Sequence, residues 1–256
     1  MRRECAVFTL LGDASTGRRA AILHDDIYAA LRHDLISGAL APGQRMSIRT
    51  LAESFGTSLV PVRDALKRLV AEHALLMLPN RTVCVPMMTR ERFQELLQAR
   101  LALETMLARR AAERITHDRI AALDEVNDGM QRAVKAGDVK SYLAANYAFH
   151  FGLYAAADSS VILPMVEMLW VQAGPFLNAV FTDQGTRNAG GNHREVVKAL
   201  RRRDPVGAAA AINADLADAA DLILATVDFH VGDQSPPRTR ARRSAAAAAR
   251  DLMETG

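Results

Sequence analysis

The stretch TLAESFGTSLVPVRDALKRL, Thr50–Leu69, predicts two short helices joined at Phe55-Gly56-Thr57. In each half the apolar residues recur at steps of three and four, which is the spacing of one face of a helix. Pro61 falls in the first turn of the second helix, where its missing N–H breaks no helical hydrogen bond. The apolar stripe of that helix consists of Val62, Ala65, Leu66, Leu69 and Val70. Its opposite side is therefore free to contact a partner.

The flanking sequence extends this unit in both directions. Asp25 and Asp26 open an amphipathic run that ends at Gly38, which predicts a first helix, and LAPGQRMS (residues 40–47) follows as a turn. Ser47 and Ser58 stand where they can cap the next two helices. The segment LLMLPNRTVCVP (residues 75–86) predicts two short strands around residues 79–82. The unit thus ends in a hairpin.

The outer side of the third helix carries Leu59, Val60, Arg63 and Lys67, and positions 60, 63 and 67 follow helical steps. A helix laid N-terminus first into the major groove of DNA reaches base edges from such positions, and arginine can bind guanine bidentately. Arg63 is therefore the expected base contact. The expected phosphate contacts are Arg49, Lys67, Arg68 and Arg81. The alternative is an ordinary solvated face in which Asp64 and Arg68 form an i,i+4 ion pair.

Residues 25–87 resemble the winged helix-turn-helix of the GntR family of bacterial transcription regulators. The matching residues are Leu51-Ala52, Phe55-Gly56, Ser58, Pro61-Val62-Arg63, Ala65-Leu66, Arg68-Leu69 and, in the wing, Pro79, Arg81 and Val85. Leu59 and Val60 replace the Arg and Thr that are usual in the family, and Thr82 replaces the usual Gly of the wing. The resemblance implies that Ser58, Leu59, Val60 and Thr82 also meet the DNA, and that a homodimer binds a palindromic operator in double-stranded DNA.

From Thr89 onward the sequence shows no strand pattern. Helical segments are predicted at 90–114, 117–135, 138–157, 160–182, 190–203 and 205–230, and their short connections favour antiparallel neighbours. We therefore expect a mostly α protein. Its parts are a flexible lead-in (1–23), a winged helix-turn-helix (24–88), an all-helical antiparallel bundle (89–230) and a basic, disordered tail (231–256).

The helical half resembles the effector-binding FCD domain of the FadR branch of the GntR family. The resemblance rests on the segments QARLALE (98–104), NYAFH (146–150), LYAAA (153–157) and NHREVVKAL (192–200). It implies a divalent metal (Zn²⁺, Ni²⁺ or Mn²⁺) bound by Asn146, His150, His193 and Asp215, where Asp215 stands in place of the usual His. It also implies that Arg100 binds a small carboxylate or sugar-acid effector. Without a metal, His150, His193 and Arg100 could bind the acid directly, and an Arg100–Glu104 i,i+4 ion pair is a purely structural alternative.

The overall composition fits a cytoplasmic protein. The 256 residues include two cysteines, Cys5 and Cys84, which stand far apart and so favour a reducing compartment, and the apolar segments make poor membrane spans. Both ends of the chain are basic, which suits a nucleoid-associated protein when it is bound to its operator. The expected function is a transcription regulator, a repressor, and not an enzyme. The alternatives are a helical scaffold that uses the winged helix for protein contacts and a metal-dependent hydrolase.

Overall fold

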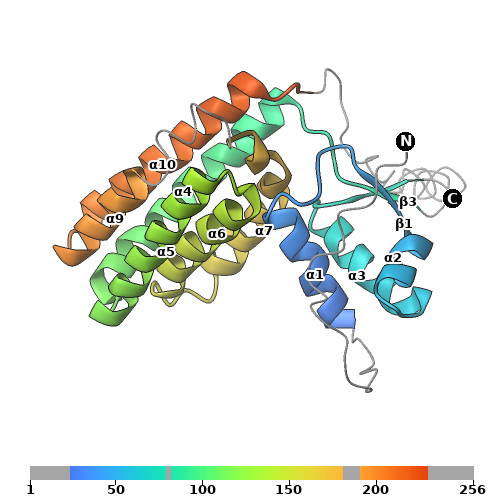
Figure 1. Cartoon of the computed structure of the whole chain (residues 1–256), viewed down its shortest axis with the longest axis horizontal. Coiled ribbons are helices and arrows are strands. Elements are labelled where there is room, and N and C mark those ends of the chain that lie inside the picture. Colours follow the sequence, from blue (N-terminus) through green and yellow to red (C-terminus); the bar gives the residue numbers. More distant parts are fainter. Residues whose placement is uncertain (1–23, 79–81, 181–190, 230–256) are drawn as a thin grey trace, which may run out of the picture.

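The computed structural model describes residues 24–78, 82–180 and 191–229. The expected lead-in (1–23), the basic tail (231–256) and Arg81 lie outside these ranges. The described chain forms a small helix-turn-helix module with a three-stranded sheet, followed by a bundle of long helices (Figure 1). Within these ranges, no helix combines the length and the apolar character that a membrane span requires.

The helix-turn-helix module contains α1 (His24–Ile36), α2 (Ile48–Ser54) and α3 (Leu59–Ala71). Ile27, Leu31 and Leu35 of α1 are fully buried and pack on α3, whose Val62, Ala65, Leu66 and Leu69 form the stripe that the sequence predicts. The side chain of Ser47 accepts a hydrogen bond from the backbone N–H of Thr50, so the predicted cap of α2 is present. This core fixes the angle at which α3 faces outward.

The sheet contains one strand more than the sequence predicts. Besides β2 (Leu76–Leu78) and β3 (Thr82–Cys84), residues Arg45–Ser47 form β1, and the antiparallel order is β1-β3-β2. We expected residues 40–47 to be a turn, and this expectation was wrong for the last three. The turn at Pro42-Gly43 brings them beside β3, where Arg45 pairs with Cys84 and Ser47 with Thr82. The sheet is therefore anchored to the start of α2.

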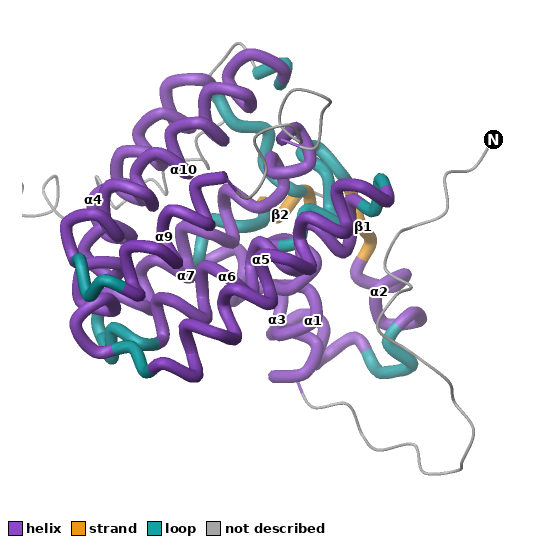
Figure 2. Tube along the Cα trace, turned by 60° about the vertical axis from the view of Figure 1, so that its left-hand side comes forward, coloured by secondary structure: helices purple, strands orange, loops and turns teal. Residues whose placement is uncertain are grey.

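The bundle contains six described helices, and the bounds of all but α7 agree closely with the predicted segments. They are α4 (Arg90–Arg114), α5 (His117–Ala136), α6 (Val139–Ala155), α7 (Ile162–Ala173), α9 (Gly191–Arg201) and α10 (Pro205–Thr226). The long helix α4 packs against α10, α7 and α6, while α5 packs against α6 and α9 (Figures 1 and 2). One helix, α4, therefore touches most of the others and can gather side chains from several of them.

The segment predicted as one helix over 160–182 is broken. After α7 ends at Ala173, residues Gly174–Val180 form a 3-10 helix, η2. Pro175 explains the change, because it has no N–H to donate and its ring clashes with the carbonyl four residues earlier in a continuing α-helix. The result is that the chain turns toward α1 at this point.

The last turn of α1 lies directly against α7 and η2, so the module and the bundle share an interface. Arg32 of α1 forms an ion pair with Glu167 of α7 (Nη2 to Oε2, 3.0 Å), and the side-chain amide of Asn178 donates to the carbonyl of Gly38. A Cβ at Gly174 would stand only 2.3 Å from the carbonyl oxygen of Leu35. Only a glycine allows so close an approach of the two backbones.

Candidate DNA-binding surface and metal centre

The N-terminal end of α3 is open to a partner. Ser58 occupies the N-cap position, but its side chain makes no capping hydrogen bond. The next two side chains are exposed, Leu59 at 39% and Val60 at 63%, although both are apolar. Exposed apolar groups at the start of an outward-facing helix suit contact with thymine methyl groups in a major groove.

The basic residues of this surface differ in their exposure and in the partners that hold them. Lys67 pairs with Asp64 (3.1 Å) and Arg49 with Glu53 (2.9 Å), and because all four side chains are more than half exposed, these pairs are weak and exchange easily for phosphate. Arg63 is half-buried on the same helix.

Arg68 is held differently. Its Nη1 lies 2.9 Å from Asp25 of α1, and its guanidinium carbon lies 3.8 Å above the ring of Tyr28. The i,i+4 pair considered between Asp64 and Arg68 is therefore not the one formed. Arg68 therefore ties α3 to α1, whereas Lys67 pairs within α3 with Asp64.

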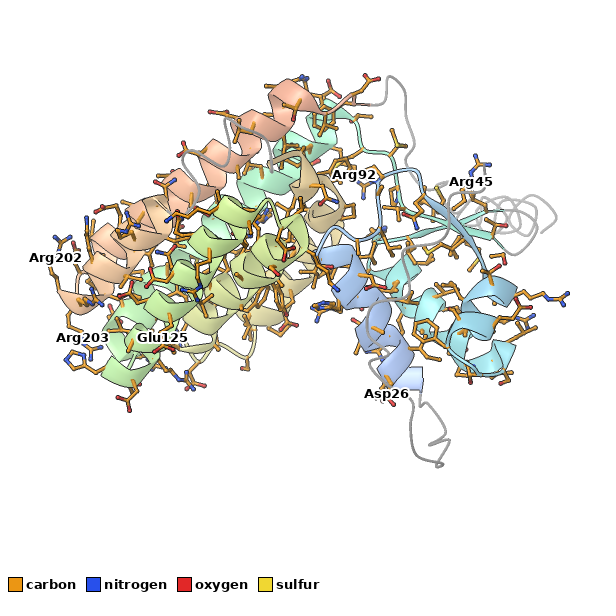
Figure 3. All side chains as sticks on the ribbon, viewed as in Figure 1. Asp26, Arg45, Arg92, Glu125, Arg202 and Arg203 are labelled. Atoms are coloured by element: carbon orange, nitrogen blue, oxygen red, sulfur yellow. The ribbon has the colours of Figure 1, made fainter. Side chains whose placement is uncertain are left out.

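Arg45 is a cation that sequence reasoning missed. It is exposed on β1, directly before Met46, which pairs with Val83. Figure 3 shows its side chain at the edge of the sheet away from the bundle. Its neighbour Ser47 pairs with Thr82 of the wing strand. The only signal in the sequence was a basic residue after Pro42-Gly43, which local periodicity does not distinguish from a turn.

Three of the four proposed metal ligands converge in the bundle. His150 of α6, His193 of α9 and Asp215 of α10 bring one atom each within 4.8 Å of the others. The two imidazole Nε2 atoms are 3.2 Å apart, and they lie 3.2 and 3.3 Å from the two oxygens of Asp215. Ligands held about 2.0 Å from a tetrahedral metal stand roughly 3.3 Å apart, so these spacings fit a single ion.

A buried hydrogen-bond chain fixes which nitrogen of His150 faces this centre. Tyr154 donates its hydroxyl proton to Glu104 (2.7 Å), so the contact between the same hydroxyl and His150 Nδ1 (3.0 Å) must use the proton of the imidazole. His150 Nε2 then presents a lone pair to Asp215 and His193. A ring N–H held by a neighbour, with the other nitrogen free to bind an ion, is the arrangement found in metal-bound histidines.

The charge state of the cluster follows from its burial. Burial lowers the pKa of His150, so the ring stays neutral more readily than a free imidazole. Burial alone would raise the pKa of Asp215, but the two neighbouring imidazoles hold this pKa well below its usual range. The cluster therefore offers two nitrogens and an ionised carboxylate, which is a borderline donor set that suits zinc or nickel.

Glu104 is the buried acid on which this network depends. It is fully buried and accepts hydrogen bonds from Arg100 Nε (2.6 Å), Tyr154 Oη (2.7 Å) and Trp170 Nε1 (3.0 Å). The i,i+4 ion pair with Arg100, considered above as a structural alternative, is thus present. The guanidinium of Arg100 also lies 4.6 Å from the centre of the Trp170 ring.

The remaining ligand candidate, Asn146, is half-buried on α6, four residues before His150 and hence on the same face of the helix. Arg100 is separate from the three-residue cluster, because it lines a pocket between α4 and α10 to which none of the cluster residues contributes. Sequence reasoning did not single out Tyr154 or Trp170, which connect the two places.

An outward-facing helix-turn-helix joined to a helical domain with a buried polar centre defines a DNA-binding transcription regulator with a sensor domain. Residues 23–85 match the model of the bacterial regulatory proteins of the gntR family, and residues 95–218 match the FCD domain. The chain belongs to the GntR family. It is not an enzyme, since its relatives and its fold are those of transcription regulators.

Individual relatives agree with this assignment. The HTH-type transcriptional regulator McbR of Escherichia coli (strain K12) is 33% identical over 180 residues, which cover 69% of this chain and 81% of McbR. The gluconate operon transcriptional repressor of Bacillus subtilis (strain 168) is 28% identical over 169 residues, 66% of this chain and 65% of the repressor. The solved structure of E. coli McbR/YncC superimposes with a TM-score of 0.74 at 30% identity, covering 79% of this chain and 96% of that one.

Proposed function

We propose that this regulator is a homodimeric repressor in which residues 24–88 bind a palindromic operator and residues 89–230 bind a divalent metal and a small organic acid. The convergence of His150, His193 and Asp215 at mutual distances of 3.2–3.3 Å carries the metal part of the proposal. Asn146 would supply the fourth ligand from the same face of α6 as His150. When bound, the ion would hold three helices together at one point.

The DNA part of the proposal assigns Arg63 to base recognition and Arg49, Lys67 and Arg45 to phosphates. Its support is that these cations stand on α2, α3 and β1, with Arg49 and Lys67 committed only to exposed partners. Ser58, Leu59, Val60 and Thr82 complete the surface. Arg68 would act mainly by holding α3 on α1, since Asp25 and Tyr28 already engage its guanidinium.

The regulatory part of the proposal runs through α7. Trp170 of this helix donates to Glu104 beside Arg100, while Glu167 and the neighbouring Gly174 contact α1. An acid that binds at Arg100 changes the surroundings of Trp170. It thereby changes the position of α1 against α7. A ligand that favours one arrangement of this contact must shift the operator-binding equilibrium.

A thermal-shift series on chelator-treated protein tests this function. We expect Zn²⁺ or Ni²⁺ to raise the melting temperature, because a ligand that binds only the folded state stabilises it, and we expect an organic acid to raise it further. The same metal and acid should weaken binding to a fluorescent DNA fragment from the upstream region of the gene. If neither metal nor acid changed stability or DNA affinity, the sensor function would be rejected while the DNA-binding role remained.

A further inference from the structure

A chain of hydrogen bonds runs through the interior of the bundle from the metal-ligand candidate His150 to Arg100. His150 Nδ1 lies 3.0 Å from the hydroxyl oxygen of Tyr154, and this oxygen lies 2.7 Å from Glu104 Oε2. Glu104 Oε1 lies 2.6 Å from Arg100 Nε. The four residues stand on α6 and α4, which pack against each other (Figure 1). None of them is more than 6% exposed, so bulk water does not compete for these bonds.

The direction of this chain is set at its Arg100 end. A guanidinium and an indole N–H can only donate, so Arg100 and Trp170 both require Glu104 to accept. The adjacent charge of Arg100 keeps Glu104 in its ionised form, which has no proton to give. Tyr154 must therefore point its hydroxyl proton at Glu104, and only a lone pair is left for His150. The imidazole has to supply the proton of the last bond.

A second acceptor competes for the proton of His150. Asp215 Oδ2 lies 3.2 Å from His150 Nε2 and would accept a hydrogen bond from a proton on that nitrogen. A protonated Nε2 has no lone pair with which to bind a metal ion. The contact with Tyr154 opposes this arrangement, because an Nδ1 without its proton would face a lone pair of the hydroxyl oxygen. The chain therefore keeps Nε2 available for the ion.

The second imidazole of the centre lacks such support. His193 Nδ1 is buried, and among the described residues it has no hydrogen-bond partner. Its ring packs on Phe149, with ring centroids 4.4 Å apart. Metal-bound histidines usually donate their second N–H to a neighbour, and in this centre only His150 does so. The orientation of the centre before metal binding therefore depends mainly on the chain behind His150.

We propose that Tyr154 and Arg100 are positioning residues of the metal centre. Arg100 keeps Glu104 an acceptor. Tyr154 relays this polarity to His150 and so keeps Nε2 ready for the ion. The proposal rests on the metal part of the function proposed above. It gives Arg100 an effect on metal affinity although Arg100 is not a ligand and lies apart from the three-residue cluster.

Zinc titrations of the full-length protein, in competition with a chromophoric chelator, measure the first consequence. Tyr154→Phe keeps the ring and removes only the hydroxyl, and it should weaken zinc binding about 10- to 100-fold. Tyr147→Phe is the matched control. It removes a hydroxyl from the same helix, beside the same Trp170 ring, but outside the chain. Its zinc affinity should equal that of the wild type.

The position of the imidazole proton is a signature that a loss of packing would not produce. Nitrogen NMR shifts of isotope-labelled, metal-free protein show which ring nitrogen carries the proton, and His150→Gln identifies the signals. We expect the proton of His150 on Nδ1 in the wild type and in Tyr147→Phe. In Tyr154→Phe it should move to Nε2, where Asp215 accepts the hydrogen bond.

A third variant tests the far end of the chain. Arg100→Met removes the charge that sets the direction, and it should weaken zinc binding at least about tenfold. In a Tyr154→Phe background the same change should add nothing, because Arg100 reaches the centre only through Tyr154. If Arg100→Met fails to fold, Tyr154→Phe and Tyr147→Phe still decide the proposal through zinc affinity and the position of the proton.

The outcomes separate this proposal from the metal site itself. Zinc that binds Tyr154→Phe as tightly as the wild type would overturn the proposal and keep the site. A proton that stays on Nδ1 of His150 in this variant would do the same, as would a cost of Arg100→Met that persists without the hydroxyl. A wild-type protein that does not bind zinc would instead overturn the metal site, and with it this proposal.

Discussion

Arg32 of α1 and Glu167 of α7 form an ion pair of 3.0 Å that joins the helix-turn-helix module to the bundle. Both side chains are partly buried, at 19% and 34% exposure, so the pair is screened less than one at the surface. Because Trp170 lies one turn further along α7 and bonds Glu104, a single short helix contacts both the polar network of the bundle and α1. This relationship makes α7 an element through which the two parts can influence each other.

Glu167→Gln should therefore reduce the coupling between sensor and operator. We expect a loss of about 0.5–1 kcal/mol in the free energy of unfolding, together with a smaller effect of the acid on operator affinity. The measurement is DNA-binding anisotropy with and without the organic acid that stabilises the protein in the thermal-shift series. Glu195→Gln is the matched control, because it removes an exposed ion pair with Lys198 on α9 (2.7 Å) far from α1. An equal loss of response in both variants would contradict a specific role for α7.

Gly174→Ala should destabilise the protein by about 1–3 kcal/mol, because the new methyl group would overlap the backbone of Leu35 and Ile36. Urea unfolding measures the change. Gly129→Ala is the control, since Gly129 lies within α5 with only the end of Arg132 within 4 Å, and alanine there should stabilise the helix by about 0.5–1 kcal/mol. A neutral Gly174→Ala would mean that α1 does not sit on η2 in solution.

Arg63→Ala should cost about 1–3 kcal/mol of operator binding and relax the choice of base at one position. Lys67→Ala should weaken binding to all sequences alike and reduce the slope of log affinity against log salt by about one. Anisotropy titrations on the operator and on a scrambled fragment, each at several salt concentrations, separate these effects. If Arg63→Ala changed only the salt slope, Arg63 would be a phosphate contact.

His193→Ala should abolish the stabilisation by Zn²⁺ or Ni²⁺ while leaving DNA binding at basal levels. His117→Ala provides the control, because His117 is exposed at the start of α5 and outside the cluster. Asn146→Ala should weaken metal binding about tenfold if the amide is the fourth ligand. Calorimetric titration of chelator-treated protein measures all three, and a metal affinity that His193→Ala leaves unchanged would contradict the site.

The metal-free protein should lose stability on acidification in two steps. Burial lowers the pKa of His150 below its usual 6.5, so the unfolded chain takes up this proton first and the folded state loses stability as the pH falls below about 6.5. The lowered pKa of Asp215 adds a second loss below about 3.8. The slope of the first step is at most about 1.4 kcal/mol per pH unit for one proton. Urea unfolding of chelated protein from pH 8 to 5 measures it, and a flat profile would show that His150 titrates normally.

Local pattern predicted most of the fold because most of its elements are amphipathic helices with clear breakers. Gly137, Asp204 and Pro205 end or begin helices where the sequence indicates. Strand β1 was missed because Arg45–Ser47 has no pattern of its own and exists through its pairing with β3, far along the chain. The break after Ala173 carried a local signal, Gly174-Pro175, that was outweighed by the apolar period on both sides.

The candidate site was only partly predictable for a similar reason. His150, His193 and Asp215 could be named through resemblance, but nothing in the spacing of α6, α9 and α10 says that their side chains meet. The roles of Tyr154 and Trp170 depend on Glu104, whose burial is a property of the packed bundle. A buried acid predicts that donors exist, but the sequence does not say which of the many polar residues provide them.

The threefold hydrogen bonding of Glu104 has a consequence for how this sequence can diverge. A descendant that loses Arg100 alone inherits a buried carboxylate with no counter-charge, and one that loses Glu104 alone leaves the buried charge of Arg100 and the N–H of Trp170 without their acceptor, each change at a cost of several kcal/mol. Selection should purge such single steps. We therefore expect four residues to be inherited or replaced as a group: Arg100, Glu104, Tyr154 and Trp170. A regulator that acquires a new effector by changing its arginine should also carry substitutions among the buried residues that contact it.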